Sequence, residues 1–267
     1  SSVHKWKKHD SGSKITEQQY LLFKVLWDIK CSPMCAAQDL NLRDFFGQAR
    51  YWLATFRPFQ AYLNTIDGDK TPGNSDIGIF EIPREQQQQV RELLQSSGTR
   101  RKGLQSPNEE IVNSSLLSSE RLAWCVSLDG FLASEVTSQT QVIVEAKANR
   151  RHRHSPQVFM QEAAELVAAL VTGPPKGLTK DRALLISQDG DELYVAKAYC
   201  LDKYIAIMQD QERNAIAKNG FLKIRQWGPR RINERDDIEG FARLVLAVAL
   251  QASAENYRSV YGEYRKP

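Results

Sequence analysis

The sequence predicts an α/β (α+β) fold, in which helices flank a central β-sheet and a helical extension precedes it. Three patterns lead to this class. The run 142–144 is Val-Ile-Val, and consecutive β-branched residues favour a buried strand. Asp189-Gly190 lies between two apolar runs, which is the pattern of a β-hairpin. The ranges 156–171 and 236–261 have apolar residues three and four positions apart, which is typical of amphipathic helices.

Composition places the chain among ordinary globular proteins. Its 267 residues suffice for one large domain, or for one domain with an extension. Hydrophobic residues make up 42% and charged residues 25%, which provides enough apolar material for a sizeable core. The formal net charge of +4 permits a polyanionic partner without requiring one. Since no run is apolar enough for a transmembrane helix, we expect no membrane association.

The four cysteines argue against a zinc site. Only Cys31 and Cys35 are close in sequence, and no second Cys or His pair follows at zinc-binding spacing. Cys125 and Cys200 lie in apolar runs, so we expect them to be buried free thiols. Reduced thiols suit an intracellular protein of the nucleus or cytoplasm.

Helical patterns occupy most of the first hundred residues. Apolar and aromatic residues recur at helical spacing over 15–29 and over 35–56, and Pro58 is expected to end the second helix. We expect these aromatic residues to belong to the core rather than to a platform for stacked bases. The Gln-rich range 84–95 indicates an exposed helix.

A basic, flexible pattern over 96–106 predicts a boundary. It divides the chain into an N-terminal helical region, 1–100, packed on the core, and a second region, 101–267. In the second region a helix is expected over 107–119, because Pro107 suits the first turn. The other predicted elements are strands over 122–129, 142–147, 182–187, 193–198 and 221–226, a basic loop over 228–231, and helices over 156–171, 202–218 and 236–261.

Three charged residues are placed to converge. Asp129 lies in a short Asp-Gly turn after an apolar run, and Glu145 lies at the end of the next strand. Because side chains alternate along a strand, Glu145 and Lys147 point to the same face. Two carboxylates and an ammonium would then meet, and a divalent cation would relieve the repulsion between the carboxylates. The alternative is a surface hairpin with an ordinary Glu and Lys on its exposed face. Asp76 is a weaker candidate for the first acid because it is much farther along the chain.

In type, order and spacing, Asp129, Glu145 and Lys147 resemble the active-site signature of the PD-(D/E)xK superfamily, the restriction-endonuclease-like nucleases. Leu128 stands where the name of the motif has proline. The resemblance covers about residues 107–226, and in its helix and strand order it is similar to uncharacterised fungal members. It implies a restriction-endonuclease-like core, with a mixed β-sheet flanked by helices. Residues 1–100 match nothing in the family.

The resemblance also implies an activity, that of a metal-dependent nuclease, an endonuclease or an exonuclease, acting on DNA or RNA. Asp129, Glu145 and the Ala146 carbonyl would hold Mg²⁺ or Mn²⁺, which polarises the phosphate and lowers the pKa of a bound water. Lys147 would orient that water or stabilise charge on the transition state. A nuclease fold that has lost catalysis and binds nucleic acid or a protein is the alternative. An interaction protein that works through its N-terminal helices is a further one.

Accessory residues are implied by the same resemblance. The helix before the first strand often carries a glutamate, and Glu109 is favoured over Glu110 because it shares a face with apolar residues. A glutamine on the helix after the motif often faces the active site, and Gln161 is suitably placed, although a solvent-facing position is equally compatible.

The basic run 150–154 follows the Glu-x-Lys strand directly. Arg150, Arg151 and Arg153 are candidates for contacts to nucleic-acid phosphates, although such a run is as often a solvated loop.

Overall fold

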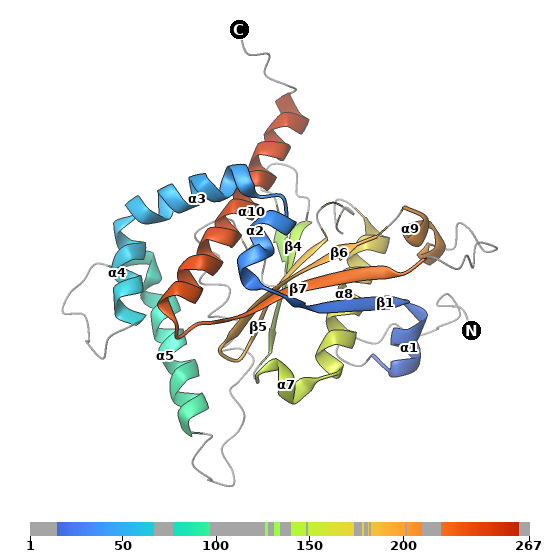
Figure 1. Ribbon diagram of the computed structural model, residues 1–267, viewed down its shortest axis with the longest axis horizontal. Coiled ribbons are helices and arrows are strands. Elements are labelled where there is room, and N and C mark those ends of the chain that lie inside the picture. Colours follow the sequence, from blue (N-terminus) through green and yellow to red (C-terminus); the bar gives the residue numbers. More distant parts are fainter. Residues whose placement is uncertain are drawn as a thin grey trace.

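The computed structural model describes residues 15–66, 77–96, 126–127, 131–133, 140–147, 149–173, 178, 181, 183–200, 202–209 and 220–261 (Figure 1). Within these residues, one mixed seven-stranded sheet has the order β1-β7-β6-β5-β4-β3-β2. The strands are β1 Val25–Cys31, β2 Val126–Ser127, β3 Phe131–Ala133, β4 Thr140–Lys147, β5 Leu184–Asp189, β6 Glu192–Tyr199 and β7 Leu222–Arg231. The pairs β1–β7 and β4–β5 are parallel, and the others are antiparallel. The predicted α/β class with a central mixed sheet is therefore confirmed.

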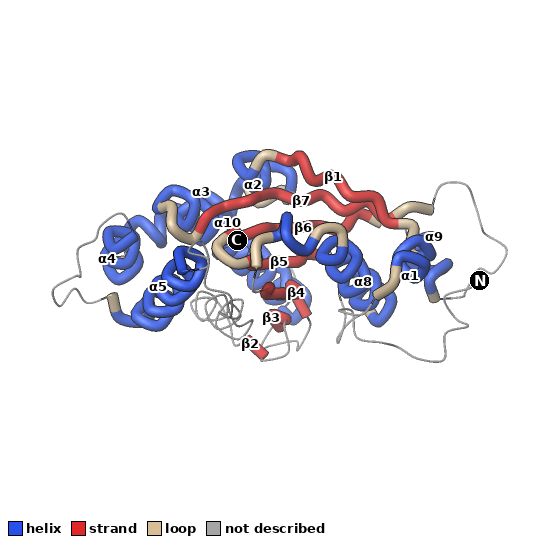
Figure 2. Tube along the Cα trace, turned by 90° about the horizontal axis from the view of Figure 1, so that it is seen from below, coloured by secondary structure: helices blue, strands red, loops and turns tan. Residues whose placement is uncertain are grey.

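Helices cover both faces of this sheet (Figures 1 and 2). Among the described residues the helices are α1 Glu17–Leu22, α2 Ala36–Asp39, α3 Arg43–Thr55, α4 Arg57–Ile66, α5 Glu81–Ser96, α7 Arg151–His154, α8 Gln157–Thr172, α9 Asp202–Met208 and α10 Arg235–Tyr261, with 3₁₀ turns at Pro33–Cys35 and Gly78–Phe80. No helix within the described part of the chain is both long and apolar enough to cross a membrane.

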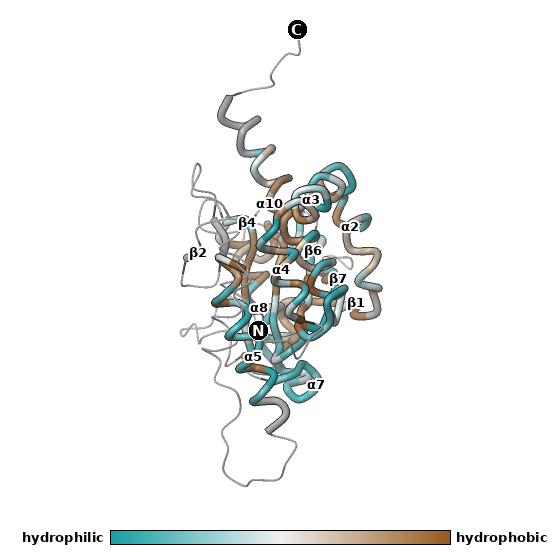
Figure 3. Tube along the Cα trace, turned by 90° about the vertical axis from the view of Figure 1, so that its left-hand side faces the viewer, coloured by the Kyte–Doolittle hydropathy of each residue, from teal (hydrophilic) through white to brown (hydrophobic). Residues whose placement is uncertain are grey.

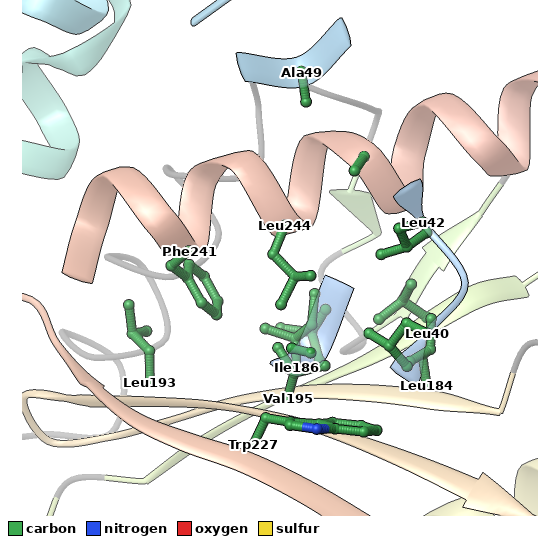
Figure 4. Packing of buried hydrophobic residues seen from close by; sticks show 14 of the residues in the cluster. Leu40, Leu42, Ala49, Leu184, Ile186, Leu193, Val195, Trp227, Phe241 and Leu244 are labelled. Atoms are coloured by element: carbon green, nitrogen blue, oxygen red, sulfur yellow. The ribbon is translucent and has the colours of Figure 1, made fainter. Parts of the chain in front are cut away.

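Alternation along the strands divides the core into two layers. Ile186 packs with Phe241 and Leu244 of α10 on one face, where Trp227 is also buried (Figure 4). Leu185, the preceding residue of β5, points to the other face and joins a cluster with Leu166 of α8. These opposite directions explain why β5 is buried along its whole length. The face under α8 carries the candidate site.

Two backbone features place the ends of β4 and α8. The β5–β6 hairpin turns at Gly190 and Asp191, and the positive φ of +63° at Gly190 suits a residue without a Cβ. The Gly190 amide donates to the carbonyl of Lys147 at 2.8 Å, which ties the end of β4 to this turn. Helix α8 ends at Gly173, whose φ is +64°. The predicted hairpin and the predicted helices 156–171 and 236–261 are thereby confirmed.

Other expectations were wrong. The range 15–29 is not one helix: α1 ends at Leu22, Lys24 takes a positive φ of +50°, and β1 follows. Helical spacing misled because β1 is stabilised by pairing with β7, nearly two hundred residues later in the chain. Since β1 belongs to the sheet, the predicted boundary near residue 100 does not separate a helical region from a sheet region. The basic range 228–231, expected as a loop, belongs to β7.

The N-terminal helices also differ from expectation in what they bury. Trp52 on α3 and Phe56, which directly follows this helix, are exposed, although they were expected in the core, whereas Phe59 on α4 is buried. Helix α5 is largely hydrophilic (Figure 3), yet it buries Gln87 and Val90. The predicted helix over 107–119 lies outside the described residues, as does most of the predicted helix 202–218 beyond α9.

Candidate active site

Two predicted site residues lie at the carboxyl end of β4. Glu145 and Lys147 are two residues apart in the strand and face the layer that contains α8. In the parallel pairing of β4 with β5, Glu145 is opposite Ser187 and Lys147 is opposite Asp189. The Lys147 ammonium forms an ion pair with the Glu145 carboxylate, and their side chains are 12% and 19% exposed. The two charged side chains are thus largely buried, and a small part of each reaches solvent.

Helix α8 brings an amide to the same carboxylate. Gln161 donates from Nε2 to Oε1 of Glu145 at 3.0 Å and to Oε1 of Glu165 at 2.9 Å. One NH₂ group therefore donates to the side chains of two glutamates, and this use of both hydrogens fixes which end of the amide faces Glu145. The structure places Gln161 beside the Glu-x-Lys pair rather than towards solvent.

Glu165 was not identified from the sequence. Burial, and then the nearby negative charge of Glu145, raise its pKa to about 8, so it carries its proton at neutral pH. Its Oε2 is buried and has no hydrogen-bond partner among the described residues. A buried polar atom of this kind is uncommon and points to a strained or functional place.

The first arginine of helix α7 turns inward. Arg151 is only 4% exposed, and its guanidinium makes five hydrogen bonds. The expectation that Arg151 contacts phosphates is wrong for this reason: its side chain is inside the protein and its donors are used. The acceptors are Asp189 Oδ2 at 2.6 Å, Ser187 Oγ at 2.7 Å, Glu162 Oε2 at 3.0 Å, and also Glu162 Oε1 and Gln226 Oε1.

In the buried group of Arg151, Glu162 and Asp189, the effect of burial on each pKa is opposed by the neighbouring opposite charges. Burial alone would lower the pKa of Arg151, but Glu162 and Asp189 outweigh it and the pKa is raised. Burial raises the pKa of Glu162 to about 7, against the opposing effect of Arg151. Burial also raises the pKa of Asp189, while Arg151 and Lys147 act in the other direction. Asp189 is therefore electrostatically linked to both Arg151 and Lys147.

The other arginines of the basic run have different surroundings. Arg150 is half-exposed and forms a two-bond ion pair with the buried carboxylate of Asp191, from Nε and Nη2, each at 2.6 Å. Arg153 is exposed on α7. Within the described part of the run, Arg153 therefore remains the arginine best placed to meet a ligand from solvent.

The remaining predicted residues cannot be placed. Asp129, Glu109 and Glu110 lie outside the described residues, so neither the first acid nor the accessory acid enters this geometry. Among the residues that are described, no group of three or more His, Cys, Asp or Glu side chains could hold a metal ion. Glu145 and the Ala146 carbonyl are the predicted metal-binding groups that the structure describes.

Three acids of the site were missed by the sequence reasoning. Glu162 and Glu165 interrupt an otherwise apolar part of α8, and an acid on the buried side of a helix is a signal that could have been used. Asp189 was assigned only to the hairpin. Nothing local distinguishes it, because its partners come from α7 and from β4.

Comparison with known proteins gave no match to a family model, to a curated protein or to a solved structure.

Proposed function

We propose that this chain is a metal-dependent nuclease with a restriction-endonuclease-like core, which hydrolyses phosphodiester bonds in DNA or RNA. The observation that carries the proposal is the arrangement at the end of β4. Glu145 and Lys147 share one face of the sheet, and Gln161 donates from α8 to the same carboxylate. A carboxylate for a cation, an ammonium for developing negative charge and an amide that orients the carboxylate are the groups that such a reaction needs.

The oxygen donors of this place suit a hard divalent cation. The described hydrogen bonds of Glu145 both fall on Oε1, and the Ala146 carbonyl can add a neutral oxygen. Mg²⁺ or Mn²⁺ held there would polarise the scissile phosphate and ionise a water. Because Lys147 already neutralises Glu145, it competes with a cation for this carboxylate, and we expect weak affinity.

A second carboxylate is needed, and Asp129 is the proposed source. Phe131 of β3 is paired with Ile143 of β4, which is two residues before Glu145. Asp129 is two residues before Phe131 in the chain, and two residues of chain span at most about 7 Å. This neighbourhood supports Asp129 over Asp76 as the partner of Glu145.

Each of the other residues of the proposed site then has one role. Lys147 stabilises the negative charge that develops on the phosphoryl oxygens. Gln161 keeps the Glu145 carboxylate in one orientation. Arg153, exposed on α7 next to this end of the sheet, contacts a backbone phosphate of the substrate.

The test is a cleavage assay with single- and double-stranded DNA and RNA, circular and linear, in Mg²⁺ or Mn²⁺. Lys147→Ala should keep the fold and bind the metal but lose roughly 10²–10³-fold in cleavage rate, as removal of a transition-state stabiliser does. Glu145→Ala should lose both metal binding and cleavage. Lys223→Ala, which removes an exposed lysine of β7, is the control and should cut at the wild-type rate.

Cleavage by Lys147→Ala at the wild-type rate would reject this assignment. Nucleic-acid binding by the wild type without cleavage would instead favour the alternative of a non-catalytic binding module. Cutting of circular substrates would identify an endonuclease.

A further inference from the structure

Arg151 is unusual because every one of its donors is used inside the protein. A guanidinium has five N–H groups, and all five of them donate to side chains of Asp189, Ser187, Glu162 and Gln226. Its central carbon also lies 4.1 Å from the centre of the Tyr194 ring and 5.3 Å from that of Phe159. Lysine, with three donors on a point charge, could not make this set of contacts.

Such a group is an expensive way to stabilise a core. Burying charges costs several kcal/mol per ion, and well-packed apolar residues often stabilise a protein as well or better. What a buried, fully bonded arginine adds is direction, because its planar fork fixes the positions of its partners. The partners therefore indicate what Arg151 is for.

Those partners are neighbours of the site residues. Asp189 is opposite Lys147 in the β4–β5 pairing, and the Asp189 oxygen that Arg151 leaves free, Oδ1, is buried without another hydrogen bond among the described residues. Glu162 directly follows Gln161 on α8, and Arg151 holds both of its oxygens. One side chain thus joins the strand beside Lys147 to the helix that carries Gln161.

We propose that Arg151 is a positioning residue, which through Asp189 and Glu162 holds Lys147 and Gln161 in fixed directions around Glu145. The Ser187 and Gln226 contacts extend the same support to β5 and β7. The kinetic consequence rests on the proposed nuclease function, whereas the geometric consequence does not.

The test uses the full chain and two size-matched variants, Asp189→Asn and Glu162→Gln, with Arg151→Lys as the conservative replacement. Asp189→Asn keeps an acceptor for Arg151 but removes the charge opposite Lys147. Asp39→Asn is the matched control: its carboxylate accepts from Trp227 and lies near Arg225 on another part of the sheet, away from this group.

The first readout is the NMR signal of the Gln161 side-chain amide, assigned by its loss in Gln161→Leu. In the wild type both amide protons are hydrogen-bonded, so we expect them to be shifted and slow to exchange. They should move towards the values of exposed glutamines in Glu162→Gln and Arg151→Lys, which disturb the link to α8, and stay unchanged in Asp39→Asn. If Glu162→Gln and Arg151→Lys fold and leave this signal unchanged, Arg151 only stabilises the fold.

The second readout is the split between kcat and KM on any substrate that the wild type cuts. Displacement of Lys147 or Gln161 in the test variants should lower kcat by about tenfold to a hundredfold and leave KM within about twofold of the wild-type value. An unchanged kcat in folded Asp189→Asn would overturn the proposal. If the wild type cuts nothing, the nuclease function is rejected and the Gln161 signal alone decides the positioning role.

A third readout needs no variant. In the wild type, five bonds should stop rotation of the Arg151 guanidinium, so its N–H protons should give separate, slowly exchanging signals. A single averaged signal would refute the geometry even if all the variants failed to fold.

Discussion

Glu165→Gln should change how the stability of this protein depends on pH. Burial and the charge of Glu145 raise the pKa of Glu165 to about 8 from an ordinary value of 4.5. The folded protein therefore keeps a proton that the unfolded chain releases near pH 4.5. Because the folded state binds more protons in this range, the free energy of unfolding falls as the pH rises from about 4.5 to about 8. Glutamine has the shape of the protonated acid and does not titrate, so the variant should lose this dependence.

The magnitude follows from the same pKa. At ~1.4 kcal/mol per pKa unit, raising the pKa from 4.5 to about 8 corresponds to about 5 kcal/mol. Local opening that admits water to the ionised carboxylate would reduce the penalty, so this value is an upper limit. Near pH 5 the variant and the wild type should have similar stability. By pH 9 the variant should be more stable, by up to about 5 kcal/mol.

Urea unfolding at a series of pH values from 5 to 9 measures this difference directly. Glu85→Gln, on the exposed side of α5, is the control for the substitution itself. The interaction with Gln161 is retained, since the glutamine carbonyl can accept the hydrogen bond that Glu165 accepts. If Glu165→Gln and the wild type lost stability in parallel over this range, Glu165 would not hold its proton in the folded state and its burial beside Glu145 would be refuted.

Three further outcomes are expected. Arg153→Ser should lower the slope of log affinity for nucleic acid against log salt by about one, whereas Arg43→Ser on α3 should not; equal slopes would make α7 a solvated turn. Asp129→Ala should reduce Mn²⁺ uptake in calorimetry, and uptake equal to that of the wild type would remove Asp129 from the metal site. Leu185→Ala, at a fully buried position, should cost about 2–5 kcal/mol in urea unfolding. Leu26→Ala, at a half-exposed position, should cost much less, so equal losses would contradict the core described for the α8 face.

Local patterns were sufficient for the elements whose stabilising partners lie on one side. Helices α8 and α10 were predicted from apolar spacing because each packs one stripe against the sheet. The β5–β6 hairpin was predicted from Asp189-Gly190, since a two-residue turn needs a residue that accepts a positive φ. The common direction of Glu145 and Lys147 also follows from the sequence, because strand side chains alternate whatever the partner strand is.

The sequence did not indicate which residues pair at long range. Strand β1 was taken for helix because its partner β7 is far along the chain, and the pairing outweighs local propensity. The aromatic residues of α3 could not be divided into half-buried and exposed ones before the position of the helix was known.

Around Glu145, too, one part of the arrangement follows from the sequence and another part only from tertiary packing. The order Asp129, Glu145, Lys147 is a property of the sequence, and it predicted a site at the end of the strand 142–147. Within the run 150–154, no local rule distinguishes Arg151, which is buried, from Arg153, which is exposed. Arg151 turns inward because the side chains of Asp189 and Glu162, 38 and 11 residues away, offer it buried acceptors, and only tertiary packing brings these two acids together.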